Sequence, residues 1–246
     1  AHARGGADAV RIGGPIMDMA KSGCVTDKNG VQIAVDNMAL SYLEIKPKFV
    51  DEARKEFEYE CQFFLDDAGN ELLQDCMNMV FTDWILFESD VFDSSAIQNY
   101  LTNFGGISDK DRHILEQVDS NQAFGFFRFD GLFEDDANGK GILVYDPFTG
   151  KKISVQSEAS YEFARDGRWS TGSGVSMRVA EVDGEHYAIG QFFAHDRAQF
   201  NEGMSIVIAR MGQAYNVSWM LPLAMDILNP DGRLSKSREL RTVNAA

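Results

Sequence analysis

Hydrophobic positions recur with a helical period through the first half of the chain. Within residues 48–69 the apolar residues follow one another at intervals of three or four, as on the buried face of an amphipathic helix. Residues 70–88 repeat this spacing and place Trp84 and Phe87 on the apolar stripe. The pattern predicts two long antiparallel helices, and we expect Trp84 and Phe87 to anchor them to the rest of the protein.

Short polar residues mark the starts of three further helices. Ser94 or Ser95 precedes the helical stretch 96–104, Ser108 precedes 109–118, and Asn201 lies near the start of a last helical segment. Serine and asparagine side chains accept hydrogen bonds from the unpaired backbone N–H groups at a helix start. We therefore predict these residues as helix caps.

After Asn121 the pattern changes to short runs of alternating or aromatic residues, which is typical of strands. Residues 147–150 (PFTG) form a turn signal, and Asp183-Gly184 is the signal for a type I′ hairpin. Short strands joined by tight turns predict a small, strongly bent antiparallel sheet or a partly open barrel. The five predicted strands are residues 122–134, 139–146, 151–157, 174–182 and 185–193.

These patterns predict an α+β protein with an N-terminal helical part, a small barrel-like antiparallel β module and a C-terminal helix. The stretch before Gly30 is rich in Gly and Ala and has no sustained period, so we expect a flexible leader there. The predicted divisions are a leader at 1–30, a helical domain at 31–118, the β module at 119–198, a C-terminal helix packing on the body at 199–228 and a tail at 229–246.

Negative charge is concentrated in the helical part. The chain has a net charge of −15, and thirteen acidic residues lie between Asp51 and Asp93, opposed only by Arg54 and Lys55. Such a surface repels phosphate backbones and argues against nucleic acid as a partner. It is either the solvated face of a helix or a docking surface for a protein with a basic surface. The docking surface would consist of Glu52, Glu56, Glu60, Asp67, Glu71 and Asp75.

Cysteine usage and hydropathy indicate a cytoplasmic protein. Cys24, Cys61 and Cys76 are an odd number without CxxC spacing, which argues against a disulfide framework and a four-cysteine zinc site. No run of 18 apolar residues occurs, and the first residues lack the apolar core of a signal peptide. We expect no membrane span, no metal and no cofactor. The sequence does not predict the oligomeric state.

Candidate catalytic residues are few. The chain has four histidines, no GxSxG elbow, and no glycine-rich loop of the kinds that bind nucleotides. His186 and His195 are nine residues apart, and two strand ends could bring them together beside Asp196. These three residues form an alternative site for a hydrolase-like enzyme that would use acidic residues with one of the histidines.

One predicted strand is unusually aromatic. In residues 122–134 (QAFGFFRFDGLFE), four phenylalanines surround Arg128. Exposed aromatic rings on such a strand can stack on the bases of single-stranded nucleic acid. The net charge of −15 argues against this function, which stays a second alternative. The four rings are Phe124, Phe126, Phe127 and Phe129.

Three stretches carry a family resemblance: VFTDWILFE (80–88), ILVYDPFTGKKISVQSEAS (142–160) and MRVAEVDGEHYAIGQ (177–191). Together they resemble the uncharacterised bacterial region found beside SEC-C motifs, in which a helical segment precedes a small β module. The cysteine-rich, zinc-binding SEC-C tail is absent here, and the turn at 164–174 is longer than in that region. The resemblance implies a fold and carries over no catalytic residue. The sequence thus favours a non-enzymatic, cytoplasmic interaction or adaptor protein.

Overall fold

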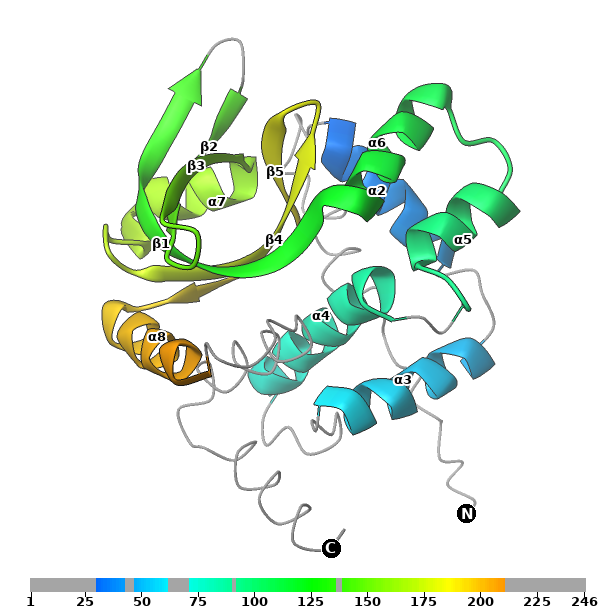
Figure 1. The fold of residues 1–246 in the computed structure, drawn as a ribbon, viewed down its shortest axis with the longest axis horizontal. Coiled ribbons are helices and arrows are strands. Elements are labelled where there is room, and N and C mark those ends of the chain that lie inside the picture. The colour runs from blue at the N-terminus through cyan, green and yellow to red at the C-terminus, as the bar shows by residue number, and fades with distance from the viewer. Residues whose placement is uncertain (1–29, 43–46, 62–70, 90–91, 136–138, 211–246) are drawn as a thin grey trace, which may run out of the picture.

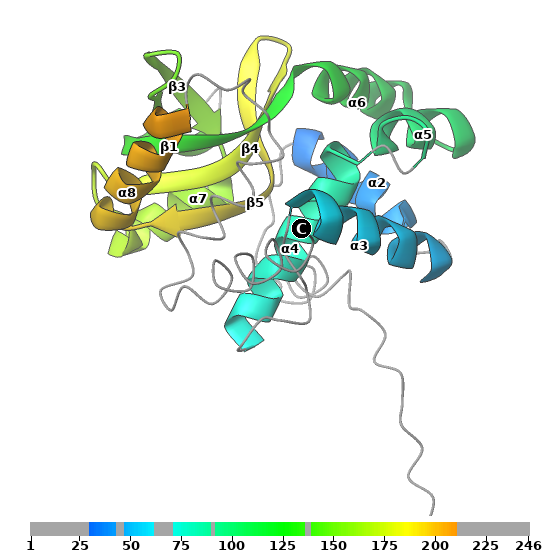
Figure 2. The ribbon, with the colours of Figure 1, turned by 60° about the horizontal axis from the view of Figure 1, so that its bottom comes forward.

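The structure is a computed structural model that describes residues 30–42, 47–61, 71–89, 92–135 and 139–210. The helices before the first strand are α2 (Gly30–Tyr42), α3 (Pro47–Cys61), α4 (Glu71–Phe87), α5 (Ala96–Asn103) and α6 (Asp109–Asn121). They lie beside a β-barrel (Figure 1), and a view turned by 60° shows the same two parts next to each other (Figure 2). The predicted α+β class with a barrel-like module is confirmed.

The barrel closes in the order β1-β2-β3-β5-β4. A short helix, α7 (Glu158–Phe163), and a π-helical turn, η2 (Ala164–Arg168), connect β3 to β4. The barrel is therefore a closed ring of five strands, with a helix between the third and fourth strands. The strands are β1 (Gln122–Asp135), β2 (Gly139–Asp146), β3 (Lys151–Gln156), β4 (Gly174–Val182) and β5 (Glu185–His195).

The sequence predicted an antiparallel β module, and this prediction is wrong for one pair of strands. β3 and β5 run parallel, because the chain crosses from β3 through α7 before it returns along β4 and β5. Both predicted turns are confirmed. Asp183 and Gly184 have φ angles of 53° and 83°, as a type I′ turn requires. Gly150 has a φ of 69°, and its N–H donates to the carbonyl of Asp146.

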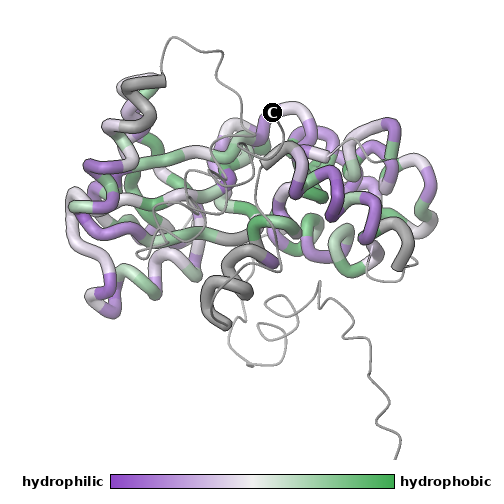
Figure 3. The backbone as a smooth tube through the Cα atoms, turned by 90° about the horizontal axis from the view of Figure 1, so that it is seen from below, coloured by the Kyte–Doolittle hydropathy of each residue, from purple (hydrophilic) through white to green (hydrophobic). Residues whose placement is uncertain are grey.

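Successive side chains of β4 point to opposite faces of the strand, and both faces are buried. Each face belongs to a different hydrophobic core. Val175, Met177 and Val179 point into the barrel, where they pack with residues of β1, β2 and β3. Ala180 and Val182 belong to the core between the barrel and the helices, together with Trp84 and Phe87. Hydrophobic positions accordingly occur in the strands and in the helices (Figure 3). We call the two the barrel core and the interface core.

Two of the predicted helix caps are confirmed. The hydroxyl of Ser95 accepts from the backbone N–H of Gln98, and that of Ser108 accepts from Asp111. Asn201 is not a cap, because the last described helix, α8 (Arg197–Arg210), begins earlier. Its cap is Asp196, whose carboxylate accepts from the N–H of Gln199 at 2.8 Å. The predicted leader, the tail and the second half of the predicted C-terminal helix lie outside the described residues.

Candidate functional site

A fully buried arginine joins the barrel to α4. Arg178 lies on β4, and its guanidinium donates hydrogen bonds to both carboxylate oxygens of Asp83, with nitrogen–oxygen distances of 2.5–3.2 Å. Oε1 of Glu88, just after α4, lies 2.6 Å from Nη1. The amide oxygen of Gln122 accepts a hydrogen bond from the same nitrogen. We call these four residues the arginine cluster. The guanidinium also lies over the ring of Phe87, 4.8 Å from its centroid.

The arginine cluster places one positive and one negative charge away from water, and the second carboxylate, that of Glu88, is partly buried. The side chain of Arg178 is 0% exposed and that of Asp83 is 5% exposed. Burial alone would lower the pKa of Arg178, but the carboxylates of Asp83 and Glu88 outweigh burial and raise this pKa above its ordinary value. Removing one partner of a buried ion pair leaves an uncompensated charge. The cluster therefore disfavours any docking of α4 on the barrel that would separate these charges.

A bulge in β5 makes room for Asp83. Arg178 lies opposite Ile189, but the preceding residue of β4 lies opposite Phe192, so β5 contains two extra residues at this point. One of them, Gly190, has a left-handed φ of 72°, and a Cβ built on it would lie 3.0 Å from Oδ1 of Asp83. Glycine suits both conditions because it tolerates positive φ and has no Cβ. The bulge thus places a residue without a side chain, Gly190, beside the carboxylate of Asp83.

A buried serine–histidine pair lies on the same face of β4, two residues from Arg178. The Oγ of Ser176 is 2.6 Å from Nε2 of His195, and the two residues are 0% and 1% exposed. The ring of His195 lies 5.2 Å from that of Phe126, which stacks on Phe200 of α8. This pair therefore lies where α8 covers β4 and β5.

Burial controls the protonation of His195. It lowers the pKa of His195 to about 4, and the nearby carboxylate of Asp196 offsets only part of this effect. Nδ1 of this imidazole has no hydrogen-bond partner among the described residues. A histidine that activates a serine must accept its proton near the working pH, beside a place for substrate. In this buried form the Ser176–His195 pair instead acts as a contact between β4 and the end of β5.

The predicted histidine site does not assemble. His186 and His195 belong to one strand and lie near its opposite ends, so the expectation that two strand ends bring them together is wrong. Nε2 of His186 lies 3.9 Å from Oε2 of Glu181. Asp196 is exposed, and its carboxylate caps α8. The three residues therefore have separate surroundings.

Of the predicted acidic docking surface, the structure describes two side chains, and both lie on α3. Glu52 is exposed and Glu56 is half-buried. Two acidic residues of the same sequence stretch, Asp83 and Glu88, point inward to Arg178 and are not part of a surface. Asp67 and the side chains of Glu60, Glu71 and Asp75 lie outside the described residues.

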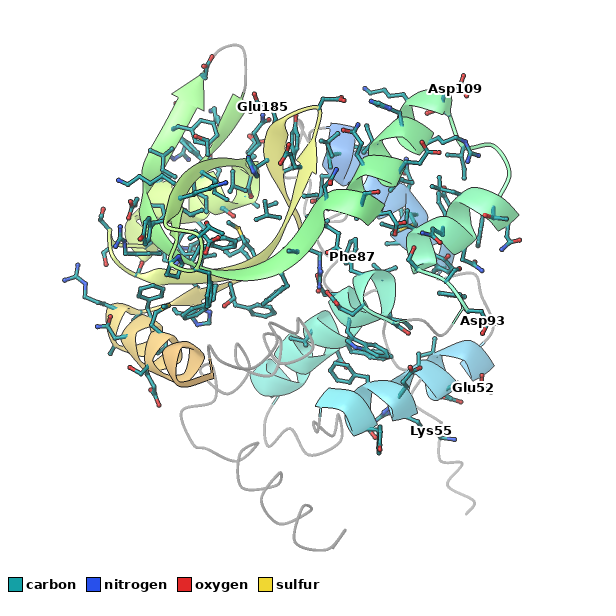
Figure 4. All side chains as sticks on the ribbon, in the orientation of Figure 1. Glu52, Lys55, Phe87, Asp93, Asp109 and Glu185 are labelled. Atoms are coloured by element: carbon teal, nitrogen blue, oxygen red, sulfur yellow. The ribbon has the colours of Figure 1, made fainter. Side chains whose placement is uncertain are left out.

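An exposed tyrosine accompanies the acidic residues of α3. Tyr59 is 79% exposed, and it lies on the same side of the helix as Glu52 and Lys55, at spacings of seven and four residues. Figure 4 shows Glu52 and Lys55 on α3, away from the barrel, whereas Phe87 lies between α4 and the barrel. The opposite face of α3 buries Phe57 against Trp84, with 5.4 Å between ring centroids. This orientation leaves the acidic face toward solvent.

The aromatic strand does not present a stacking surface. Phe124 and Phe126 are buried in the interface core, and Phe127 and Phe129 are buried in the barrel core. Nε of Arg128 donates a hydrogen bond to Oδ1 of Asp130, at 2.8 Å. In this structure the four rings are core residues, two in each core.

The burial of Trp84 and Phe87 is confirmed, at 1% and 8% exposure. The arginine cluster and the Ser176–His195 pair were missed. A weak signal was present in each segment: Arg178 interrupts an apolar strand (VSMRVAEV), and Asp83 interrupts an apolar helix (FTDWILF). Charged residues in such positions are rarely buried unless they are paired. The signal nevertheless does not say which residue pairs with which.

Comparison of the chain with protein-family models, with curated proteins and with solved structures finds no match. The resemblance to the region beside SEC-C motifs therefore stays a prediction. Among the described residues no group of three or more His, Cys, Asp or Glu side chains is arranged to hold a metal ion. Within the same residues, the helices are too short or too polar to span a bilayer.

Proposed function

We propose that this chain is a non-enzymatic interaction protein of the bacterial cytoplasm, whose helical part presents an acidic surface to a basic partner. The observation that supports it best is the unequal distribution of charge. Residues 31–121 contain 19 acidic and 6 basic residues, a net charge of −13. Residues 122–195, which form the barrel, contain 11 acidic and 7 basic residues, a net charge of −4. Most of the net charge therefore lies in the part of the sequence before the barrel.

The centre of the proposed surface is the outer face of α3. This face carries Lys55 as well as Glu52 and Glu56, and the acidic excess of the helical part attracts a basic partner. Tyr59 adds a large, exposed aromatic side chain beside Glu52 and Glu56. Tyrosine is enriched among the residues that dominate binding energy at protein interfaces, and its ring attracts cations. A partner segment rich in Lys or Arg suits this combination.

The hydrolase alternative has less support. It relied on His186 or His195, and the two lie at opposite ends of β5, with His195 buried beneath α8. The charged groups of the arginine cluster join α4 to the barrel. These observations favour a rigid body that displays a surface.

The test compares capture by the native chain with capture by a variant that carries Glu52→Gln, Glu56→Gln and Tyr59→Ala. A matched control carries Asp109→Asn and Glu116→Gln, two exposed acidic positions on α6. We expect native chain and control to retain the same host proteins at low salt and to release them at high salt, because screening reaches about 8 Å at physiological ionic strength. The α3 variant should lose them. Equal retention by all three proteins would refute the proposed surface.

A further inference from the structure

The helix α8 covers the buried serine–histidine pair through apolar contacts. Its Phe200 is buried and stacks on Phe126, with 5.1 Å between ring centroids. The same ring packs on the backbone of β4, since a Cβ built on Gly174 would lie 2.7 Å from it. Met204, one turn later, is half-buried against the interface core. The arginine cluster includes no residue of α8, so among the described residues this helix can leave the barrel without separating a buried ion pair.

Neutral His195 fits its site with one of its two ring nitrogens paired. Nε2 lies 2.6 Å from Oγ of Ser176, and Nδ1 is buried without a hydrogen-bond partner among the described residues. The neutral ring carries a proton on only one nitrogen, whereas the charged ring donates from both. A proton added to the ring in place would therefore leave a buried, charged N–H group without an acceptor, which is costly.

The charged groups at the start of α8 already have other contacts. Asp196 follows His195 in the chain, and its carboxylate caps α8. The guanidinium of Arg197 donates to the backbone carbonyl of Thr171, at 2.8 Å. Glu202, the carboxylate within α8, is exposed. The carboxylate that could reach the ring of His195 is thus the one that holds the first turn of this helix.

The strands beside the ring supply cations and no acceptor. β4 contributes Arg178, which belongs to the arginine cluster, and β1 contributes Arg128, which donates to Asp130. A guanidinium cannot accept a hydrogen bond from a protonated imidazole. Among these charged groups, the carboxylate of Asp196 is the one that raises the pKa of His195, and burial outweighs it.

We infer that protonation of His195 releases α8 from the barrel. The charged ring gains an acceptor in one of two ways: water enters beneath α8, or the carboxylate of Asp196 turns from the helix to the ring. The first separates Phe200 from Phe126, and the second removes the helix cap. Both loosen the contact of α8 with β4 and β5, whereas the arginine cluster keeps α4 in place. A proton thus controls whether α8 covers this face of the barrel.

Proton linkage gives the size of the effect. With α8 detached, the ring of His195 reaches water and has its ordinary pKa of 6.5, and with α8 bound its pKa is about 4. The detached form therefore binds more protons between these values, and acid favours it. The ratio of detached to bound α8 should rise about 20-fold between pH 7 and pH 5, and little of this rise should occur above pH 6.5.

Native-state hydrogen exchange at low urea concentrations tests the inference in the native chain, between pH 7 and pH 5 and with correction for the intrinsic exchange rate. A detached helix of this length is marginal in water, so the amides of residues 201–210 should exchange through this opening. Urea should hardly promote the opening, which exposes little surface, and its population should rise about 20-fold at pH 5. The amides of α4 should exchange more slowly, with the full urea dependence of global unfolding.

Two matched variants assign the response to its proton. His195→Gln removes the titrating ring and should hold the change in α8 opening within about twofold over the same pH range. His186→Gln, near the other end of β5, should keep the 20-fold response. A 20-fold response that persists in His195→Gln would overturn the inference. So would a native chain in which α8 exchanges only together with α4, or opens equally at pH 7 and pH 5, even if His195→Gln fails to fold.

Discussion

The two faces of β4 are packed in different ways. The face toward the barrel carries Val175, Met177 and Val179, and close packing of apolar side chains stabilises it. The face toward the helices carries Ser176 and Arg178, both buried and both bound to specific polar partners. Apolar packing tolerates many arrangements of similar volume, whereas a buried charge tolerates only those that pair it. The barrel core therefore maintains the barrel, and the interface core determines how the helices dock on it.

The largest expected effect comes from a pair of matched changes at adjacent positions. Arg178→Met leaves the buried carboxylate of Asp83 and the partly buried carboxylate of Glu88 without their cation, and it should reduce the free energy of unfolding by about 3–5 kcal/mol. Met177→Leu, on the barrel side, conserves volume and should cost less than about 1.5 kcal/mol. Urea unfolding of both variants measures these losses. Equal losses would mean that the two faces of β4 are not packed differently.

Acid should weaken the interface core through His195. Its pKa is lowered from an ordinary 6.5 to about 4 in the folded protein, so the unfolded chain binds more protons between these values. Stability should therefore be complete above pH 6.5 and should fall as the pH drops toward 4, by at most about 3 kcal/mol. His195→Gln should remove this part of the pH dependence. The matched change His186→Gln at the half-buried end of β5 should retain it, and an unchanged slope in His195→Gln would contradict the assignment.

A smaller effect is expected at the bulge. Gly190→Ala forces an alanine into a positive φ and places its Cβ 3.0 Å from Oδ1 of Asp83, so we expect a loss of roughly 1–3 kcal/mol. Gly131→Ala is the control, because a Cβ there would meet only Leu143, at an ordinary 3.9 Å. Thermal unfolding of both variants measures the difference. Similar melting temperatures for the two would show that the bulge does not need glycine.

The barrel was predictable from the sequence because its signals are local. Alternating residues identified the five strands, and Asp183 with Gly184 identified the hairpin between β4 and β5. Even so, the hairpin alone does not set the full register. The bulge at Gly190 shifts the pairing by two residues, and only this shift brings His195 close enough to Ser176 for a hydrogen bond. Nothing in the residues beside the turn specifies the shift.

The contacts of the interface core were not predictable, because they join segments that are distant in sequence. Arg178 and Asp83 are 95 residues apart. The sequence correctly placed Trp84 and Phe87 on an apolar stripe. Asp83 was counted only as one of the thirteen acidic residues between Asp51 and Asp93, since composition does not distinguish a solvated carboxylate from one that faces a buried cation. The direction of that side chain depends on how the helices dock on the barrel.

A double-mutant cycle between Arg178 and Asp83 tests most directly whether specific polar pairing fixes the helices on the barrel. It compares the free energies of unfolding of the native chain, Arg178→Met, Asp83→Leu and the double variant. We predict that the double variant loses at least about 2 kcal/mol less than the two single losses combined, because Arg178→Met alone leaves the buried Asp83 carboxylate unpaired and the double change removes both partners. Glu88 loses its cation in Arg178→Met and in the double variant alike, so its contribution cancels in the cycle. Losses that add to within about 0.5 kcal/mol would contradict this account.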